Sequence, residues 1–242
     1  MTSLKRRFGQ KQLAGDPEGL SGALVTVTDP TGPASEAYRM IRTNLFYASV
    51  DAPPKVVVLT SAGPSEGKST TTANLAVALS EAGKNTLVID CDLRRPTLHN
   101  YFGTRNLRGL VDVLTVERKP QDVWHEPMLK LKLITGGPPP LNPAELLGSR
   151  RFAGLLKQVR QEFDYVLVDT PPATVVTDSA IVGALSDGVL LVLDAQGTRK
   201  SPLRQAVREL EGVGAKVLGT ILNNVAGSKG GYTSYGYTRA SG

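Results

Sequence analysis

The chain has 242 residues, of which 40% are hydrophobic, and a formal net charge of +6 at pH 7. This size fits one large domain, or at most two small ones, with room for a sizeable core. The two histidines disfavour a histidine-based metal centre, and the single cysteine, Cys91, excludes an internal disulfide, which is typical of a reducing compartment.

The sequence also shows no signal for membrane insertion or for nucleic-acid binding. No apolar run approaches the roughly eighteen residues needed to cross a bilayer, and the start, MTSLKRRFGQKQ, lacks the apolar stretch of a signal peptide. We therefore expect a cytoplasmic location. The positive charge suits an acidic partner or a membrane surface, but no basic stripe interleaved with aromatic residues predicts a nucleic-acid partner.

The first 32 residues mix charge, glycine and proline without a period, and we expect residues 1–32 to be a mostly irregular leader. Residues 33–49 then have apolar side chains at helical spacing, which predicts an amphipathic helix. Its opposite side carries Glu36, Arg39 and Arg42. In the simplest interpretation these charges form a solvated face with an internal pair between Glu36 and Arg39.

From residue 55 onward, apolar strands alternate with helices. Strands are predicted at residues 55–61, 85–90, 131–136, 164–170, 187–195 and 215–222. Continuous apolar strands separated by helices indicate a parallel sheet that is covered on both faces. We expect a doubly wound α/β domain over residues 33–225, with ligands at the carboxyl ends of its strands, and a flexible tail over residues 226–242.

The segment TSAGPSEGKST follows the first predicted strand of the sheet and opens a helix. Its Gly67-Lys68-Ser69 core matches the Walker A pattern, although Ala62 replaces the first glycine of that pattern. In such loops the backbone N–H groups hold phosphates, the lysine reaches the β- and γ-phosphates, and the hydroxyl ligates Mg²⁺. We therefore expect ATP at Gly63, Pro64, Ser65, Glu66, Gly67, Lys68, Ser69 and Thr70.

Acidic residues end two of the predicted strands. Asp90 ends the strand over residues 85–90 and Asp92 comes directly after it, and Asp169 lies at the end of the strand over residues 164–170. Carboxylates at the ends of buried strands are costly unless they serve a metal or a proton. The alternative is that Asp90 or Asp92 caps a helix, or that one of them pairs with an arginine at position 94 or 95. The expected metal ligands are Ser69, Asp90, Asp92 and Asp169.

Together these segments resemble the bacterial tyrosine kinases of capsule and exopolysaccharide synthesis. The resemblance runs from about Pro33 to the C-terminus and rests on SEAYRMIRTNL, TSAGPSEGKSTTTANLA, VIDCDLRRP, YVLVDTPP and LNPAELLGS. It implies a P-loop NTPase fold, ATP and Mg²⁺ as cofactors, and protein tyrosine as the substrate. Partition and septum-placement ATPases share this fold but carry a lysine where this chain has Gly63, which argues against a dimer of that type.

The resemblance implies catalytic roles for Lys68, Asp90 and Asp92. One aspartate is expected to help organise Mg²⁺, and the other to orient or accept the proton of the tyrosine hydroxyl. The spacing leaves open which aspartate does which, because side chains two apart on an extended segment share a side. Arg94 or Arg95 is expected either to steady developing negative charge or to form an exposed ion pair.

The C-terminal GSKGGYTSYGYTRASG places three tyrosines, Tyr232, Tyr235 and Tyr237, among glycine, serine and threonine. Such a segment cannot build a core, but a flexible tail can enter an active site and withdraw. The resemblance implies that these tyrosines are phosphorylated. The alternative is a solubilising end with incidental tyrosines.

The resemblance also implies partners. The first is a ring of identical subunits, with Glu36, Arg39 and Arg42 at the contact, in which each tail enters a neighbour's site. The others are a membrane-embedded polysaccharide co-polymerase, which activates the chain at the inner membrane, and a tyrosine phosphatase. The alternative function is an ATP-hydrolysing switch or scaffold of a membrane-linked machine, without kinase activity.

Overall fold

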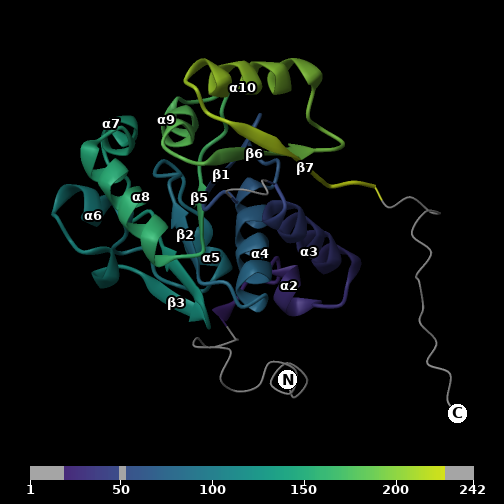
Figure 1. The fold of residues 1–242 in the computed structure, drawn as a ribbon, viewed down its shortest axis with the longest axis horizontal. Coiled ribbons are helices and arrows are strands. Elements are labelled where there is room, and N and C mark those ends of the chain that lie inside the picture. Colours follow the sequence, from purple (N-terminus) through teal and green to yellow (C-terminus); the bar gives the residue numbers. More distant parts are fainter. Residues whose placement is uncertain (1–18, 49–52, 227–242) are drawn as a thin grey trace, which may run out of the picture.

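The computed structural model of this chain describes residues 19–48 and 53–226, and Figure 1 shows a central sheet with helices on both of its faces. The sheet has seven strands in the order β3-β4-β2-β5-β1-β6-β7. Every neighbouring pair is parallel except β3 and β4. The predicted doubly wound, mainly parallel α/β fold is thereby confirmed. The strands are β1 (Val56–Ser61), β2 (Thr86–Asp90), β3 (His125–Met128), β4 (Leu131–Ile134), β5 (Tyr165–Asp169), β6 (Gly188–Asp194) and β7 (Val217–Asn223).

The helices form two layers, one on each face of the sheet (Figure 1). The helices α2, α3, α4 and α5 cover one face, and α6, α8, α9 and α10 pack on the other. The helical segments are α2 (Val25–Thr28), α3 (Pro33–Phe46), α4 (Lys68–Glu81), α5 (Leu98–Tyr101), α6 (Leu110–Thr115), η2 (Pro120–Asp122), α7 (Pro143–Leu147), α8 (Arg150–Glu162), α9 (Asp178–Ala184) and α10 (Lys200–Gly212).

Strand β1 shows why the central strands are apolar throughout. Val56 and Val58 are buried in the core formed with α8, α9 and α10, whereas Val57 and Leu59 are buried in the core formed with α3 and α4. Successive side chains of a strand point to opposite faces, so a strand covered on both faces needs apolar residues at every position. The continuous apolar runs of the sequence therefore identify the central strands.

The register of the sheet brings three strand ends together. Strand β5 lies between β1 and β2, and its last residue, Asp169, is paired with Asp90 of β2 and with Leu59 of β1. The loop after β1, the segment after β2 and the segment after β5 consequently meet at one edge of the sheet. This is the edge at which parallel α/β sheets bind ligands.

The structure differs from the predicted elements in two places. The sequence predicts an irregular leader over residues 1–32, but Leu24 and Val27 are buried against α4, and the backbone N–H of Thr26 donates to Asn74 at 3.1 Å. The packed part of the chain therefore includes residues before 33, in a helix too short to show periodicity. Strand β3 is also unpredicted, since it contains Pro127, which only an edge strand tolerates.

None of the helices in the described part of the chain combines the length and apolar character that crossing a bilayer requires.

Candidate active site

The phosphate-binding loop, residues 62–67, joins β1 to α4 and has a constrained backbone. Ser65 and Gly67 have left-handed φ values of 63° and 90°. A Cβ at position 67 would also lie 2.0 Å from Nδ2 of Asn223. The positive φ therefore favours glycine at position 67, and a Cβ there would also have to displace the Asn223 side chain. A turn with such left-handed residues is typical of a concave loop whose N–H groups bind an anion.

The first two residues of α4 lie against the carboxylates at the sheet edge. Nζ of Lys68 is 2.9 Å from Oδ2 of Asp92 and 3.4 Å from Oδ2 of Asp169. The hydroxyl of Ser69 donates to the same Asp169 oxygen at 2.6 Å. Asp169 is fully buried and Asp92 nearly so. The structure thus brings together four of the residues that the sequence singles out.

Burial and charge oppose each other in this cluster. Burial alone would lower the pKa of Lys68, but the carboxylates of Asp169 and Asp92 outweigh it and raise that pKa above its ordinary value. Burial raises the pKa of Asp169, and the nearby Lys68 ammonium and Ser69 hydroxyl oppose this rise. Lys68 is therefore a cation held by carboxylates, for which the oxygens of a phosphate would compete.

Asp90 has a different environment from its neighbour Asp92. Its Oδ2 accepts the backbone N–H groups of Thr97 and Leu98, both at 3.0 Å, and its Oδ1 accepts the N–H of Asp92 at 3.2 Å. Asp90 is fully buried, burial raises its pKa, and it does not line the pocket described below. The expected metal-binding or proton-accepting role of Asp90 stays a prediction. Its carboxylate accepts the N–H groups at the start of α5, as the helix-capping alternative for one of the two aspartates expects.

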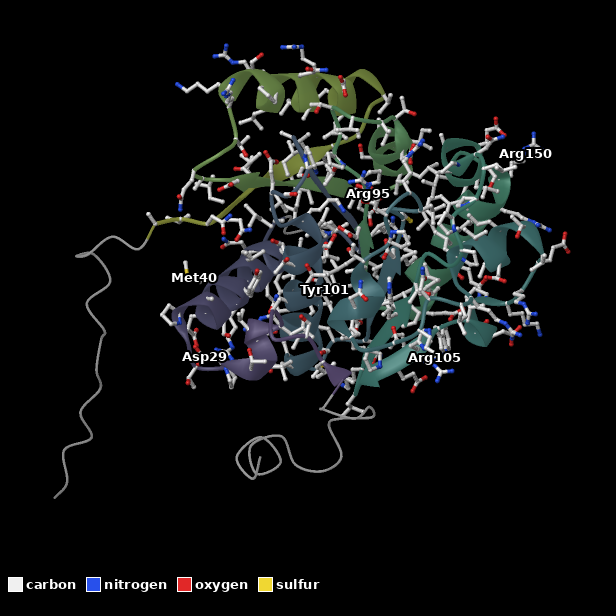
Figure 2. The ribbon with its side chains drawn as sticks, turned by 180° about the vertical axis from the view of Figure 1, so that it is seen from behind. Asp29, Met40, Arg95, Tyr101, Arg105 and Arg150 are labelled. Atoms are coloured by element: carbon white, nitrogen blue, oxygen red, sulfur yellow. The ribbon has the colours of Figure 1, made fainter. Side chains whose placement is uncertain are left out.

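A pocket of about 650 Å³ opens over the phosphate-binding loop. Two of its residues, Arg95 and Tyr101, are labelled in Figure 2 and lie near the middle of the molecule in that view. The lining comprises Pro64, Ser65, Gly67, Lys68, Ser69, Thr70, Asp92, Arg94, Arg95, Thr97, Tyr101, Pro171, Pro172, Val175 and Val176. Of the residues expected to bind ATP, Gly63 and Glu66 are not part of this lining.

Glu66 does not line the pocket, and its hydrogen bonds hold the phosphate-binding loop on the side away from the pocket; we call these contacts the brace. Its carboxylate accepts the N–H of Ala62 at 2.9 Å and the hydroxyl of Thr198 at 2.5 Å. The side-chain amide of Asn223 donates to the Glu66 carbonyl at 3.2 Å. The loop is thus tied to the segment after β6 and to the end of β7. No motif marks Thr198, so the sequence gives no signal for it.

The two arginines after Asp92 differ in their contacts. Nε of Arg94 donates to Oδ2 of Asp178 at 3.0 Å, and Asp178 is fully buried at the start of α9. This matches the ion-pair alternative for Arg94. The backbone N–H of Arg95 donates to Oδ1 of Asp92 at 3.1 Å, and Arg95 lines the pocket with its side chain exposed.

The charges predicted on α3 make contacts within their own chain. Glu36 and Arg39 form the expected internal ion pair, and Arg39 also donates to the carbonyl of Pro30 at 2.6 Å. Arg42 donates to the carbonyl of Ala78 near the end of α4 at 3.1 Å. The predicted subunit contact through these residues stays a prediction.

Tyr232, Tyr235 and Tyr237 lie outside the described residues, so their phosphorylation also stays a prediction. Across the described residues, no group of three or more aspartate, glutamate, histidine or cysteine side chains is placed to hold a metal ion. A metal at this edge of the sheet would therefore also need ligands such as Ser69 and phosphate oxygens.

Comparisons with known proteins agree with this geometry. Residues 54–218 match the family model described as an AAA domain. The tyrosine-protein kinase YwqD of Bacillus subtilis is 42% identical over 215 residues, which cover 88% of this chain and 90% of that protein. The tyrosine-protein kinase wzc of Salmonella typhimurium is 36% identical over 96% of this chain, which spans 32% of that longer protein.

A solved structure supports the same assignment. The kinase domain of the Escherichia coli tyrosine kinase ETK superposes with a TM-score of 0.81 at 33% identity, covering 88% of this chain and 84% of that one. The fold, the phosphate-binding loop and the similarity to YwqD over 90% of its length give the same assignment. The chain belongs to the bacterial tyrosine-protein kinases, a family of P-loop enzymes.

Proposed function

We propose that this chain transfers the γ-phosphoryl group of ATP to Tyr232, Tyr235 and Tyr237 of a second copy, within a system that makes capsule or exopolysaccharide. The observation that carries this proposal is the placement of Lys68 and Ser69 against Asp92 and Asp169 in a pocket open to solvent. A buried site that excluded protein side chains would not allow a tyrosine to reach this cluster.

The donor set fits ATP with Mg²⁺. The phosphate-binding loop offers backbone N–H groups, Lys68 offers its ammonium group, and Ser69 and Asp169 offer oxygen atoms beside the start of α4. Mg²⁺ prefers oxygen ligands and is commonly held by one or two carboxylates together with phosphates and water. Bound there, Mg²⁺ would neutralise charge on the β- and γ-phosphates.

Lys68 and the carboxylates then have different roles in the reaction. Lys68 exchanges its contact with Asp92 for the phosphate oxygens, which leaves the Asp92 carboxylate available as a proton acceptor. The tyrosine hydroxyl oxygen forms a bond to the γ-phosphorus, the bond from that phosphorus to the bridging oxygen of ADP breaks, and the phenol proton passes to Asp92. Asp90 acts by positioning, through the backbone that it holds.

The partners follow from the resemblance described above and form part of the proposal. Copies of the chain assemble as a ring through the face of α3 that carries Glu36, Arg39 and Arg42. The enzyme works in the cytoplasm beside the inner membrane, bound to a membrane-embedded polysaccharide co-polymerase that activates it. A tyrosine phosphatase reverses the reaction, and about two added negative charges per phosphotyrosine weaken the ring by repulsion.

Incubation with labelled ATP tests this function. The purified full chain, the Lys68→Met variant and a variant with all three tail tyrosines changed to phenylalanine are compared by mass spectrometry of the tail and by release of free phosphate. We expect tail phosphorylation in the first chain alone. Free phosphate without a phosphorylated tail would support the ATP-hydrolysing switch instead, and full labelling of the phenylalanine variant would contradict the substrate assignment.

A further inference from the structure

The last residue of α5, Tyr101, places its hydroxyl group on the first turn of the helix that follows the phosphate-binding loop. Helix α5 packs against α4, and Tyr101, which is labelled in Figure 2, lines the pocket together with Thr70. The Tyr101 hydroxyl lies 2.7 Å from Oγ1 of Thr70, and both side chains are half-buried. No sequence motif marks Tyr101, yet its hydroxyl meets a residue that the Walker A pattern assigns to ATP.

The side chains in the first turn of α4 point in two directions. Lys68 and Ser69 reach the Asp169 carboxylate, at 3.4 Å and 2.6 Å, whereas Thr70 meets Tyr101. Successive residues of an α-helix point about 100° apart, so the side chain of Thr70 leaves the helix on a different side. In the proposed reaction Lys68 and Ser69 serve the γ-phosphate end, where transfer occurs. Thr70 is therefore placed for the phosphate that is farthest from that end.

The backbone of this turn also suits a phosphate. The first backbone hydrogen bond of α4 runs from the N–H of Thr71 to the carbonyl of Gly67, at 2.8 Å. The N–H groups that precede the first such bond of a helix have no partner within the helix, and they bind anions readily. The N–H of Thr70 is one of these groups. A phosphate bound there would meet both the N–H and the hydroxyl of a single residue.

The contact with Tyr101 determines which proton Thr70 can offer to a ligand. A phenol is a stronger acid than an aliphatic alcohol and is therefore the better donor, so the Tyr101 hydroxyl donates and Oγ1 of Thr70 accepts. The hydroxyl proton of Thr70 is then free to point at a phosphate oxygen. A hydroxyl that accepts one hydrogen bond becomes a stronger donor in the next. Tyr101 thus both orients and strengthens the contact that Thr70 makes with a phosphate.

Helix α5 is held at both ends, which fixes the position of Tyr101. At the start of the helix, the buried carboxylate of Asp90 accepts the N–H groups of Thr97 and Leu98, each at 3.0 Å. At its end, the carbonyl of Tyr101 accepts the N–H of Ser21 at 3.0 Å. A side chain that orients a ligand-binding group needs such a fixed support. Asp90 therefore acts on the nucleotide through the position of α5.

We propose that Tyr101 is a positioning residue for the nucleotide, whose hydroxyl directs the Thr70 hydroxyl to the α-phosphate of ATP. This inference rests on the nucleotide site of the proposed function, and it does not depend on which residue accepts the phosphoryl group. The α-phosphate is present in ATP and in ADP, and transfer leaves it unchanged. The contact therefore stabilises the bound substrate and the transition state equally. Its loss is expected to raise the KM for ATP and to leave kcat within about twofold of the parent value.

Nucleotide binding tests this role without any transfer step. The full chain, Tyr101→Phe, Thr70→Val and the double variant are titrated with fluorescent analogues of ADP and of non-hydrolysable ATP, in the presence of Mg²⁺. We expect Tyr101→Phe to weaken the binding of both nucleotides by the same factor, about threefold to tenfold, the effect of one hydrogen bond. Thr70→Val is expected to weaken binding at least as much. The double variant is expected to lose no more than Thr70→Val, because Tyr101 acts through Thr70.

A sulfur atom at the α-phosphate separates positioning from a merely structural role. ATP with sulfur in place of one non-bridging α-oxygen exists as Rp and Sp diastereomers, and a directed hydroxyl favours the form that keeps oxygen on its side. We expect the parent chain to bind one diastereomer more tightly, and Tyr101→Phe to reduce this preference. Tyr47→Phe, at an exposed tyrosine after α3, is the matched control and is expected to change neither affinity nor preference.

Three results would each overturn the inference. They are unchanged ADP affinity in Tyr101→Phe, losses that add up in the double variant, and a lower affinity that comes with a lower melting temperature and an unchanged diastereomer preference. Failure of the proposed function gives a different result. The parent chain would then bind nucleotides with the expected dependence on Tyr101 and transfer no phosphate to its tail, and the role of Tyr101 would stand.

Discussion

At the scale of single residues, Gly67 determines whether the phosphate-binding loop can form. We predict that Gly67→Ala lowers affinity for ATP by more than tenfold, because alanine strains at a φ of 90° and its Cβ would meet the Asn223 amide. Gly154→Ala in α8 is the matched control, since open space surrounds that glycine and alanine favours helices by about 0.5–1 kcal/mol. A fluorescent ATP analogue and thermal unfolding measure the two effects. Wild-type nucleotide affinity in Gly67→Ala would refute this view of the loop.

The sequence predicts some site residues better than others, for physical reasons. Lys68, Ser69 and Asp169 are predictable because a motif and the ends of apolar strands fix where they lie. Asp90 and Asp92 cannot be told apart from sequence, since only the folded chain shows which carboxylate accepts the backbone amides of residues 97 and 98.

At the scale of elements, the brace behind the phosphate-binding loop joins three segments that are distant in sequence. Glu66 contacts Thr198 after β6, and Asn223 at the end of β7 contacts the Glu66 carbonyl. We predict that Glu66→Ala raises the KM for ATP several-fold with a smaller effect on kcat, because the loop loses two hydrogen bonds that set its shape.

Two further variants separate the brace from a general loss of stability. Glu66→Gln retains one acceptor and one donor for the same partners, so it is expected to restore most of the affinity. Thr198→Val removes only the link to the segment after β6 and is expected to give an intermediate KM. Equal KM values in Glu66→Ala and the parent chain would show that the brace does not shape the loop.

A second element-scale contact predicts a dependence on pH. Asp187 accepts the N–H groups of Lys55 and Val56 at the start of β1, both at 2.9 Å, and pairs with Arg160 of α8. Burial raises the pKa of Asp187, but the hydrogen bond from the Val56 amide and the Arg160 guanidinium together lower it by more than burial raises it. The pKa of Asp187 therefore lies below its ordinary value. A lowered pKa contributes stability that is present above the unfolded-state pKa, near 4, and is lost as the pH falls through the folded-state pKa.

We predict that Asp187→Asn lowers the free energy of unfolding at pH 7 by about 0.5–1.5 kcal/mol, the effect of a lost hydrogen bond, and that this difference shrinks as the pH falls below 4. Urea unfolding at pH 7, 5, 4 and 3 measures it. Glu211→Gln at an exposed position of α10 is the control. A difference that grows towards low pH would contradict the sign of the shift.

The sequence predicts those strands and helices that have a strong local pattern of apolar residues. The sequence predicts six of the seven strands, because the central ones are covered on both faces and form continuous apolar runs, and β4 and β7 are largely apolar as well. Strand β3 lies at the sheet edge and contains Pro127, and the single turn of α2 is too short for helical periodicity. Both depend on tertiary packing against neighbours that no local pattern identifies.

Across the molecule as a whole, we expect the site at Lys68 to phosphorylate the terminus of another copy. The residues that the sequence predicts for the site and the structure brings together, Lys68, Ser69, Asp92 and Asp169, lie at one edge of the sheet beside a pocket open to solvent. The sequence alone predicts this arrangement of strand ends, because parallel strands of an α/β sheet present their carboxyl ends together.

Mixing two defective chains tests whether phosphoryl transfer occurs between copies. One chain carries Lys68→Met with its tail intact, and the other has an intact site but phenylalanine at positions 232, 235 and 237. After incubation with ATP and Mg²⁺, mass spectrometry reads the tail of the Lys68→Met chain. We predict phosphotyrosine on that tail only when the second chain is present. Transfer between copies would be contradicted by two results together. The intact-site chain would leave the tail of the Lys68→Met chain unmodified, and it would phosphorylate its own tail once the tyrosines are restored.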